Sequence, residues 1–405
     1  MHIILFEDHL VAENRPITLM RPAFAVSVAA TCLYDLARLY GSRVSCLVRA
    51  YLRPKVAEQF GSALPPSEET LFLNAALVPS FELIERLVQE VARGGNCVVR
   101  NGERVAAAYF DSLPAGYADQ DERSITRFLL ERDYRTVRME WPLVSLPFEV
   151  IKHHQKYFVE NIRRMTVGLT ETRPGVFVGA GVKIHPTAVL ETSEGPIVLR
   201  DGVTVGPFAL MIGPLIVGSN SRIIERATIK EMVQIGHTCK IGGEIECSII
   251  EPYANKQHHG FLGHSYVGSW VNLGAGTTNS DLKNTYGHVS VEHGGRRLQT
   301  DMQFLGCVIG DYSKTAINTS IFTGKIIGVS SFLYGFVGTN VPSFTNYART
   351  FGQQTECVLD AAVRTQERMF ARRKMPQGQA DIALLEHVFQ MTRDERSMPA
   401  DQLSF

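Results

Sequence analysis

Aliphatic side chains recur at every sixth position through the middle of the chain. The run is unbroken from position 199 to position 241 and comprises Leu199, Val205, Met211, Val217, Ile223, Ile229, Ile235 and Ile241. Glycine follows the aliphatic residue at positions 206, 218, 236 and 242. A helix repeats near 3.6 residues and a strand near 2, so a strict period of six fits neither alone. The pattern predicts a parallel β-helix built from hexapeptides, with the aliphatic residues pointing inward.

The same period continues on both sides of this run. Upstream it is kept by Val178, Ile184 and Leu190, before a break at 193–195, and downstream by Val267 and Leu273 and then by Ile309, Thr315, Ile321, Ile327 and Leu333. Thr315 is the one weak inward residue. We expect the solenoid to occupy residues 166–345 and to end at Pro342 and Ser343. The stretch 244–261 departs from the period, and such interruptions usually emerge as functional loops.

The residues before the solenoid alternate between strand and helix patterns. We expect strands at 2–6, 44–48, 71–73, 97–100 and 104–110, and helices at 27–40 and 81–93. Ser27 and Ser80 are the expected helix caps, and Asn101-Gly102 is a strong hairpin signal. Residues 1–148 are therefore predicted to form an α/β domain with a mostly parallel sheet and ligand loops at its strand ends.

Helical patterns flank the solenoid. Residues 149–165 predict a linker helix, on which adjacent His153 and His154 are expected to be exposed. A helical tail is expected at 346–405, with amphipathic helices at 355–373 and 378–394. The basic run 371–374 is interpreted as a solvated helix end.

Composition narrows the functional classes. The chain of 405 residues is 45% hydrophobic with a formal net charge of zero, which argues against disorder and against nucleic-acid binding. It has no run of eighteen apolar residues, so no membrane span is expected. The N-terminus lacks a basic region, and seven scattered cysteines show no CxxC spacing. These features predict a cytoplasmic protein with reduced thiols.

The chemistry is expected in the polar segment 251–284. His258, His259 and His264 lie close together there, but no cysteine accompanies them and adjacent histidines rarely converge on one zinc ion. A general base fits better, because neutral imidazole accepts a proton near pH 7. A backbone N–H of the turn 274–276, with Asn272 beside it, would stabilise the oxyanion formed when a thioester is attacked.

Two arginines mark the first loop of the N-terminal domain. Arg15 and Arg21 lie in the segment HLVAENRPITLMRP at 9–22, directly after the first strand. One interpretation is that the two guanidinium groups bind phosphate. The other is that they are solvated side chains on a long loop, and the sequence leaves both open.

Several motifs resemble one family. VGPFA at 205–209, NKQHHGFLG at 255–263 and NLGAGT at 272–277 look like the acetyltransferase domain of the bifunctional N-acetylglucosamine-1-phosphate uridylyltransferase/glucosamine-1-phosphate acetyltransferase family. LFED, RPITLMRP, GGEIECSI and GDYSKTAINTSIFTGKIIG extend the likeness along the chain, to a variant branch with a shortened N-terminal domain. The solenoid motifs are the more specific ones.

The resemblance implies a fold and a set of roles. The fold would be a Rossmann-like sugar nucleotidyltransferase domain followed by a left-handed β-helix with C-terminal helices, assembled as a homotrimer. His258 would be the catalytic base, with His259 as the neighbour that could exchange roles with it. Asn272 would contact substrate. Acetyl-CoA, the cosubstrate, would be bound between coils by Gly274, Ala275, Gly276 and Ser313.

The chain departs from the family at its anion-binding positions. Ile212 and Glu246 stand where the family has an arginine and a lysine, so Lys256 or Lys283 would bind the sugar phosphate. Asp281 replaces an asparagine of the substrate site. In the N-terminal domain the family's glycine-rich loop is absent, which leaves Arg15, Arg21 and Asn74 as the candidate nucleotide contacts. Asn74 occupies the position of an acidic magnesium ligand, so Mg²⁺ would be held less well.

Three functions follow for a protein of nucleotide-sugar synthesis and cell-envelope biogenesis. The first is acetyl transfer from acetyl-CoA to an amino-sugar 1-phosphate such as glucosamine 1-phosphate. The second is nucleotidyl transfer from UTP or dTTP to a sugar 1-phosphate, either beside the first or alone. The third is a non-catalytic trimeric scaffold with a nucleotide-sensing N-terminal domain. The partners would be sugar phosphate, acetyl-CoA and nucleotide.

Overall fold

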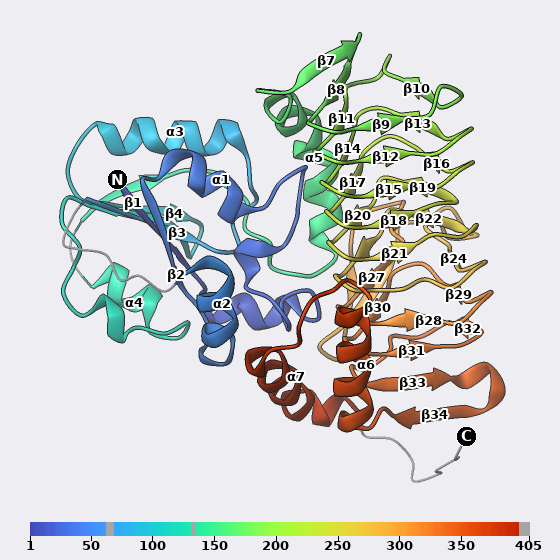
Figure 1. The fold of residues 1–405 in the computed structure, drawn as a ribbon. Helices are drawn as coiled ribbons and strands as arrows, with labels where there is room; N and C mark the ends of the chain where they lie inside the picture. Colours follow the sequence, from blue (N-terminus) through green and yellow to red (C-terminus); the bar gives the residue numbers. More distant parts are fainter. Residues whose placement is uncertain (62–68, 132–133, 397–405) are drawn as a thin grey trace. The chain divides into compact units, whose positions relative to one another are not determined.

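A computed structural model describes residues 1–61, 69–131 and 134–396 of the chain. They form two compact units, Met1–Pro147 and Phe148–Phe405, shown in Figure 1. In the described part of the chain, no helix combines the length and the apolar character needed to cross a membrane.

The first unit is built on one mixed sheet. Its spatial order is β2 (Arg43–Leu47), β1 (His2–Phe6), β3 (Thr70–Asn74), β5 (Arg104–Phe110), β4 (Cys97–Asn101) and β6 (Arg135–Arg138). The pairs of β1 with β2 and β3 are parallel, but β5 runs antiparallel to both β3 and β4. The predicted strands and the hairpin at Asn101-Gly102 are confirmed, whereas the sheet is less uniformly parallel than expected, because that hairpin reverses the chain in the middle of the sheet.

Helices cover this sheet, and one begins later than predicted. They are α1 (Leu33–Tyr40), α2 (Arg53–Phe60), α3 (Phe81–Ala92) and α4 (Ile125–Leu130). Ser80 caps α3 as expected, accepting a hydrogen bond from the Leu83 N–H at 3.2 Å. The prediction that Ser27 caps α1 is wrong. Ala29 and Ala30 have positive φ in a tight turn bridged by Val28 and Thr31, and a right-handed helix cannot run through it.

The second unit begins with α5 (Glu149–Arg164), as predicted, but its histidines are not exposed. His154 is fully buried, and its Nε2 lies 2.8 Å from the carbonyl oxygen of Met232 in the solenoid. His153 is half-buried. The inner face of α5 therefore packs against the coils, and burial lowers the pKa of His154 to about 4.

The hexapeptide stretch forms a parallel β-helix, which confirms the predicted fold class. One face holds β8 (Val176–Val178), β11 (Ile197–Leu199), β14 (Leu215–Val217), β17 (Val233–Ile235), β20 (Ile249–Ile250), β23 (Tyr266–Val267), β27 (Cys307–Ile309) and β30 (Lys325–Ile327). The second face holds β9 (Lys183–Ile184), β12 (Thr204–Val205), β15 (Arg222–Ile223), β18 (Lys240–Ile241), β21 (Asn255–Lys256), β28 (Lys314–Thr315), β31 (Phe332–Leu333) and β33 (Thr345–Ala348). The third holds β10 (Val189–Glu191), β13 (Leu210–Ile212), β16 (Thr228–Ile229), β19 (Glu244–Glu246), β22 (Phe261–Gly263), β24 (Thr278–Asn279), β29 (Ser320–Ile321) and β32 (Phe336–Val337).

The core of the β-helix is the predicted one. All eight aliphatic residues of the run from Leu199 to Ile241 are buried and belong to one hydrophobic cluster between the three faces. Thr315, the weak inward position, is also buried, and its hydroxyl bonds to that of Thr277 at 2.6 Å. Burial of this stacked column supplies the main stabilisation of the solenoid.

The stretch 244–261 does not leave the solenoid, contrary to expectation. The ladders continue through it, because β18 pairs with β21 and β19 pairs with β22. Its coil is shorter, with Ile245 and Ile250 inward at steps of less than six. The true excursion lies at 281–305 and contains the antiparallel hairpin of β25 (Ser290–His293) and β26 (Arg296–Gln299).

Both ends of the β-helix carry an antiparallel strand. At the start, β7 (Thr170–Arg173) pairs with β8, and at the end β34 (Gln353–Glu356) pairs with β33. The coil thus continues past Pro342 and Ser343, since β33 is still parallel to β31. Residues 355–356, predicted as helix, belong to β34.

Two helices follow the last coil and pack against the corners of the coils. They are α6 (Leu359–Ala371) and α7 (Gln379–Met391). The Phe370 ring lies 4.6 Å from that of Trp270, and the Phe389 ring lies 5.0 Å from that of Phe344. Trp270 and Phe344 stand at equivalent positive-φ corners of different coils, so the helices run along a column of corners.

Candidate active site

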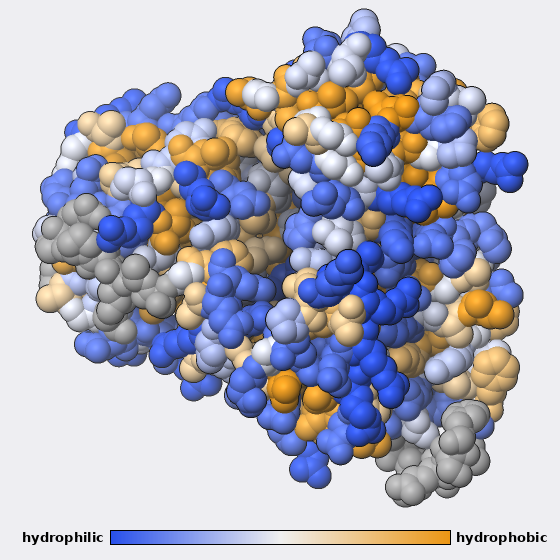
Figure 2. All heavy atoms as spheres, viewed as in Figure 1, coloured by the Kyte–Doolittle hydropathy of each residue, from blue (hydrophilic) through white to orange (hydrophobic). Residues whose placement is uncertain are grey.

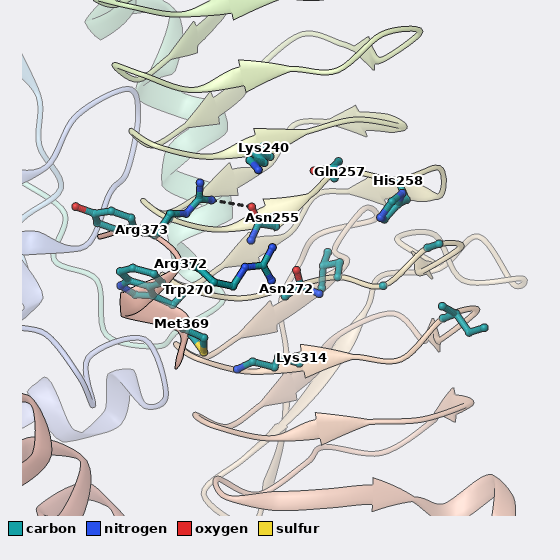
Figure 3. Close-up of a pocket in the computed structure, with 15 residues that line it drawn as sticks. Lys240, Asn255, Gln257, His258, Trp270, Asn272, Lys314, Met369, Arg372 and Arg373 are labelled. Carbon is teal, nitrogen blue, oxygen red and sulfur yellow. Dashed lines mark hydrogen bonds between the residues drawn. The ribbon is translucent and has the colours of Figure 1, made fainter. Parts of the chain in front are cut away.

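A cavity of about 510 Å³ opens between the second face of the β-helix and α6 (Figure 3). Its walls come from successive coils and from the end of the helix. The lining residues are Lys240, Tyr253, Asn255, Gln257, His258, Trp270, Asn272, Leu273, Gly274, Ala275, Lys314, Ile317, Met369, Arg372 and Arg373. A cavity of this size is typical of small-molecule sites.

One wall is a column of outward side chains set by the strand register. Lys240 pairs with Asn255, Asn255 bridges to Asn272, and Asn272 bridges to Lys314. Parallel strands in register place equivalent residues directly above one another. The column therefore presents two amides between two ammonium groups. The side chain of Asn272 is exposed and, within the described residues, has no hydrogen-bond partner.

The facing wall is the C-terminal end of α6. Arg372 and Arg373 point from the helix toward the column, and the Arg373 guanidinium donates to Asn255 Oδ1 at 2.9 Å (Figure 3). The helix is held there because Phe370 packs on Trp270, which stacks on Tyr253 with centroids 4.3 Å apart. The sequence predicts the basic run 371–374 to be a solvated helix end; Arg372 and Lys374 are exposed, and Arg372 and Arg373 also line the cavity.

His258 lies at the other end of the cavity, and its neighbour does not line it. The His258 side chain is exposed, while its carbonyl oxygen accepts a hydrogen bond from Lys256 Nζ at 2.7 Å. His259 is not among the lining residues, and its carbonyl accepts from the Gly276 N–H at 3.0 Å. The structure thus gives the two adjacent histidines different surroundings.

Lys256 does not face the cavity as an anion ligand would. It occupies the inward register position beside Ile241 and is 3% exposed. Its ammonium donates to the carbonyls of Gly242, at 3.1 Å, and of His258. Burial lowers the pKa of Lys256 to about 8. The lysine therefore holds the His258 turn from inside the solenoid.

The glycine turn contains one backbone N–H that is not used by the hydrogen bonds of the turn itself. The Gly274 N–H donates to Thr315 Oγ1 at 2.9 Å, and the Gly276 N–H is taken by His259. Among the residues that the structure describes, the Ala275 N–H between them has no acceptor. Gly276 has a φ of +74°, and a Cβ there would collide with the side chain of Asn318. Glycine is thus required for the close stacking of this turn.

The cavity is strongly cationic. Lys240, Lys314, Arg372 and Arg373 line it together with His258, and none of its lining residues is an aspartate or glutamate. Lys314 Nζ donates to the Tyr312 carbonyl at 2.7 Å, and burial lowers the pKa of Lys314 to about 8. It still carries a proton at pH 7. The site is therefore suited to an anionic ligand.

Three other predicted residues lie elsewhere. Ser313 is fully buried, with its hydroxyl donating to the Gly328 carbonyl at 2.7 Å, so its side chain does not reach the cavity. Asp281 Oδ2 lies 2.8 Å from His264 Nδ1; burial opposes protonation of this histidine, but the carboxylate and the Cys247 sulfur raise its pKa to about 10. Lys283 lies in the excursion and donates to the His288 carbonyl.

In the first unit, the carboxylates after β1 are both neutralised. Arg49 binds the Glu7 carboxylate through Nε and Nη2 at 2.9 and 3.0 Å. Arg104 binds Asp8 at 2.9 to 3.1 Å, and Asn74 donates to the same carboxylate at 2.9 Å. Both pairs lie at the carboxyl end of β1, which is where a parallel sheet presents ligand groups.

These surroundings do not fit a magnesium site. Asn74 is 1% exposed, donates also to the Val105 carbonyl, and accepts from the Ala76 N–H. Its amide is fully used within the protein, and Asp8 is engaged by a guanidinium. Mg²⁺ prefers charged oxygen ligands that are free to coordinate it. In the described residues, no three His, Cys, Asp or Glu side chains gather in a way that could hold a metal.

The first loop is a packed segment rather than an open cradle. Ile17, Leu19 and Met20 are buried, and Arg49 donates to the Thr18 and Arg21 carbonyls at 2.8 and 3.2 Å. The side chains of Arg15 and Arg21 are half-buried.

Sequence reasoning missed the cationic residues of the cavity. Lys240 and Lys314 each directly precede an inward residue of the repeat, and this spacing would have placed them on one outward column. Arg372 and Arg373 gave no comparable signal, because their place depends on where α6 docks.

Comparisons with known proteins agree with this architecture. Residues 3–170 match the sugar nucleotidyl transferase family. The "Bifunctional protein GlmU" of Rippkaea orientalis is 28% identical over 159 residues, covering 39% of this chain and 34% of the relative. A "Bifunctional sugar-1-phosphate nucleotidylyltransferase/acetyltransferase" of Sulfurisphaera tokodaii is 27% identical over 231 residues, 56% of this chain and 54% of the relative. The matches thus span only about a third to a half of these relatives.

Solved structures give weaker likenesses. A Francisella novicida UDP-N-acetylglucosamine acyltransferase aligns with 54% of this chain and 78% of its own, at 17% identity and a TM-score of 0.27. The acetyltransferase domain of PglB from Neisseria gonorrhoeae, in complex with acetyl coenzyme A, aligns with 63% and 86%, at 11% identity and a TM-score of 0.20. The β-helix assignment rests on the strand ladders of the chain itself.

Residues 3–170 match the sugar nucleotidyl transferase family, and the chain, whose β-helix follows, is similar to bifunctional sugar-1-phosphate nucleotidylyltransferase/acetyltransferases at 27–28% identity.

Proposed function

We propose that the β-helix transfers an acetyl group from acetyl-CoA to the amine of an amino-sugar 1-phosphate, with His258 as the general base. The observation that carries the proposal is the shared cavity, which brings together an imidazole, the Asn272 amide, and the glycine turn at Gly274 and Ala275. The bifunctional nucleotidylyltransferase/acetyltransferase of Sulfurisphaera tokodaii to which the chain is similar agrees with this reaction.

The chemistry needs few groups. The neutral sugar amine attacks the thioester carbonyl carbon while His258 takes the proton that the nitrogen loses. The Ala275 N–H and the Asn272 amide donate hydrogen bonds to the oxyanion of the tetrahedral intermediate. The intermediate then collapses, the carbon–sulfur bond breaks, and the departing thiolate takes the proton from His258. The products are an N-acetylated sugar phosphate and CoA with a free thiol.

The choice of His258 over His259 follows from their surroundings. His258 lines the cavity and its turn is fixed by Lys256, whereas His259 does not line the cavity. We assign acetyl-CoA contacts to Gly274, Ala275 and Gly276 and leave Ser313 in a structural role, because its hydroxyl is fully engaged between coils.

The proposal is tested by incubating the protein with acetyl-CoA and glucosamine 1-phosphate and following the free thiol. His258→Ala should lower kcat by about 10²- to 10⁴-fold, the usual contribution of a general base. His259→Ala is the matched control and should stay within a few-fold of the wild type. No turnover by the wild type, or equal turnover by His258→Ala, would falsify the proposal.

A second activity is proposed for the first unit, because residues 3–170 match the sugar nucleotidyl transferase family. Arg15, Arg21 and Asn74 are its candidate nucleotide contacts. Pyrophosphate release from UTP or dTTP with a panel of sugar 1-phosphates, with and without Mg²⁺, measures this activity. Nucleotide binding by calorimetry without any product would instead favour a sensing role.

We further propose that the chain forms a homotrimer through the third face of the β-helix. Phe322, Tyr334 and Phe336 lie on or beside the neighbouring strands β29 and β32 and are 50%, 40% and 60% exposed. Figure 2 shows hydrophobic residues exposed at the outer edge of the β-helix among hydrophilic ones. Exposed apolar groups of this size usually mark an interaction surface, and a second copy of the chain would cover them.

A further inference from the structure

The end of α6 contributes charge to the cavity that no part of the acetyl-transfer chemistry uses. Arg372 and Arg373 face the column that carries Lys240 and Lys314, so three separate segments of the chain bring cations to one space. Within the described residues, none of these four side chains has a carboxylate partner. Like charges held together without a counter-charge repel, and an anionic ligand removes that cost.

We propose that Arg372 and Arg373, together with Lys240 and Lys314, bind the phosphate groups of the substrate whose reacting end lies at His258. This inference rests on the proposed acetyl transfer and names the part of the site that recognises phosphate. Two sources of phosphate fit that reaction, namely the sugar 1-phosphate and the phosphates of CoA.

The geometry of the cavity supports a ligand with a charged and a reacting end. Figure 3 shows the two arginines at the helix side, Asn272 in the middle and His258 at the far side. Guanidinium groups bind phosphate through two parallel N–H donors, and Asn255 fixes Arg373 by a hydrogen bond at 2.9 Å. Two lysines act as point charges on the facing wall.

On the third face of the solenoid, by contrast, a described lysine is already paired with carboxylates. Lys230 lies 2.8 Å from the Glu244 carboxylate and 3.1 Å from that of Glu246. Two carboxylates against one ammonium leave that cluster negative. A phosphate is therefore attracted to the cavity below α6 rather than to this face.

The site depends on how α6 is attached. Phe370 anchors the helix to Trp270 and places the arginines that follow it over the second face. The same helix carries Arg364 and Arg368, which are exposed and do not line the cavity. Figure 2 shows a mostly hydrophilic surface over this helix. These two arginines provide a control of equal charge on the same element.

The experiment compares Arg372→Gln/Arg373→Gln with Arg364→Gln/Arg368→Gln. Calorimetry measures the binding of CoA and of glucosamine 1-phosphate, with pantetheine and glucosamine as the counterparts that lack phosphate. The first variant should raise the Kd of a phosphate-bearing ligand by about 10- to 100-fold, as expected for loss of charge-assisted hydrogen bonds. The control should stay within about threefold, and circular dichroism checks that both variants fold.

The ligand that binds more weakly to Arg372→Gln/Arg373→Gln identifies the source of the phosphate. Weaker CoA binding with unchanged sugar-phosphate binding assigns the site to CoA, and the reverse result assigns it to the sugar. Equal binding of both ligands by the two variants would overturn the inference, as would a wild type that binds neither. If the wild type turns over substrate and Arg372→Gln/Arg373→Gln has the same KM, the phosphate inference fails but the proposed acetyl transfer stands. If ligand binding depends on these arginines but the wild type shows no turnover, the acetyl-transfer proposal fails and the phosphate inference stands.

Discussion

Two buried basic residues of the second unit make hydrogen bonds to the backbone of the solenoid from positions that are usually apolar. Lys256 takes an inward place that the repeat reserves for an aliphatic side chain, and His154 fills a gap between α5 and the coils. Both donors reach backbone carbonyls, which are the polar groups available at the corners of a β-helix. Burial lowers both pKa values: His154, at about 4, is neutral near pH 7, whereas Lys256, at about 8, still carries its proton there.

His154 should make the second unit sensitive to acid. Its pKa is about 4 in the folded state against 6.5 for an unperturbed histidine, so the unfolded chain binds more protons between these values. Stability is therefore lost as the pH falls from 6.5 to 4, by roughly 3 kcal/mol from this residue. His154→Gln should remove the part of the dependence that comes from His154, while the part from His153, whose pKa burial also lowers to about 4, remains. Urea unfolding at several pH values measures it, and an identical pH slope in both proteins would contradict the assignment.

Lys256 should affect the reaction without touching the substrate. Lys256→Met keeps an apolar stem in the inward position but removes the donor to the His258 carbonyl. We expect kcat to fall about tenfold with a smaller change in KM, because a shifted base loses catalysis more than binding. Lys152→Met, on the exposed side of α5, is the control. A parallel rise in KM at constant kcat would instead mean that Lys256 contacts the substrate.

At the scale of elements, the six-residue repeat could be predicted from the sequence, but the place where α6 docks could not. The positions of the core could be read from the six-residue spacing, because one face of each short strand must be apolar. The short coil at 244–261 was misjudged since its inward steps shrink around Ile245 and Ile250, which breaks the spacing without breaking the ladder. For α6, amphipathicity indicated a buried face but not its partner.

The candidate site could likewise be predicted only where it depends on local motifs, not where it depends on contacts between distant segments. His258 and the turn at 274–276 are predicted from residue types and motifs, and His258, Gly274 and Ala275 line the cavity. Arg372 and Arg373 were assigned to solvent, since a basic helix end is usually solvated. Their role depends on contacts between segments that are about a hundred residues apart in sequence, such as Arg373 with Asn255.

The anchoring of α6 can be tested at Phe370, which is 4% exposed. Phe370→Ala should weaken docking of the helix by about 3 kcal/mol, the usual cost of removing a buried aromatic ring. Limited digestion with trypsin should then cut faster at 372–374, while circular dichroism of the β-helix stays unchanged. Val358→Ala, at a position that is 65% exposed, is the control. Equal cutting rates would show that the helix is held by other contacts.

At the scale of the whole molecule, the exposed aromatic side chains on and beside β29 and β32 of the third face suggest the expected assembly. The wild type should have three times the 45.0 kDa mass of one chain by light scattering. Phe322→Glu/Phe336→Glu introduces two charges on neighbouring strands and should shift the mass to that of one chain, because buried unpaired charges cost several kcal/mol. Val167→Glu, on an exposed residue before the first coil, should leave the mass unchanged. A monomeric wild type would contradict the trimer.

The antiparallel strands at the two ends of the solenoid affect whether another copy of the chain can add to its terminal coils. A bare terminal coil presents rows of backbone donors and acceptors to which another copy can add, as in a fibril. Here β7 and β34 run in the opposite direction to the strands they cover, so an incoming coil meets a reversed hydrogen-bond pattern. End-to-end addition is therefore disfavoured on the face that each of these strands covers, and we expect concentrated protein to resist end-to-end polymerisation.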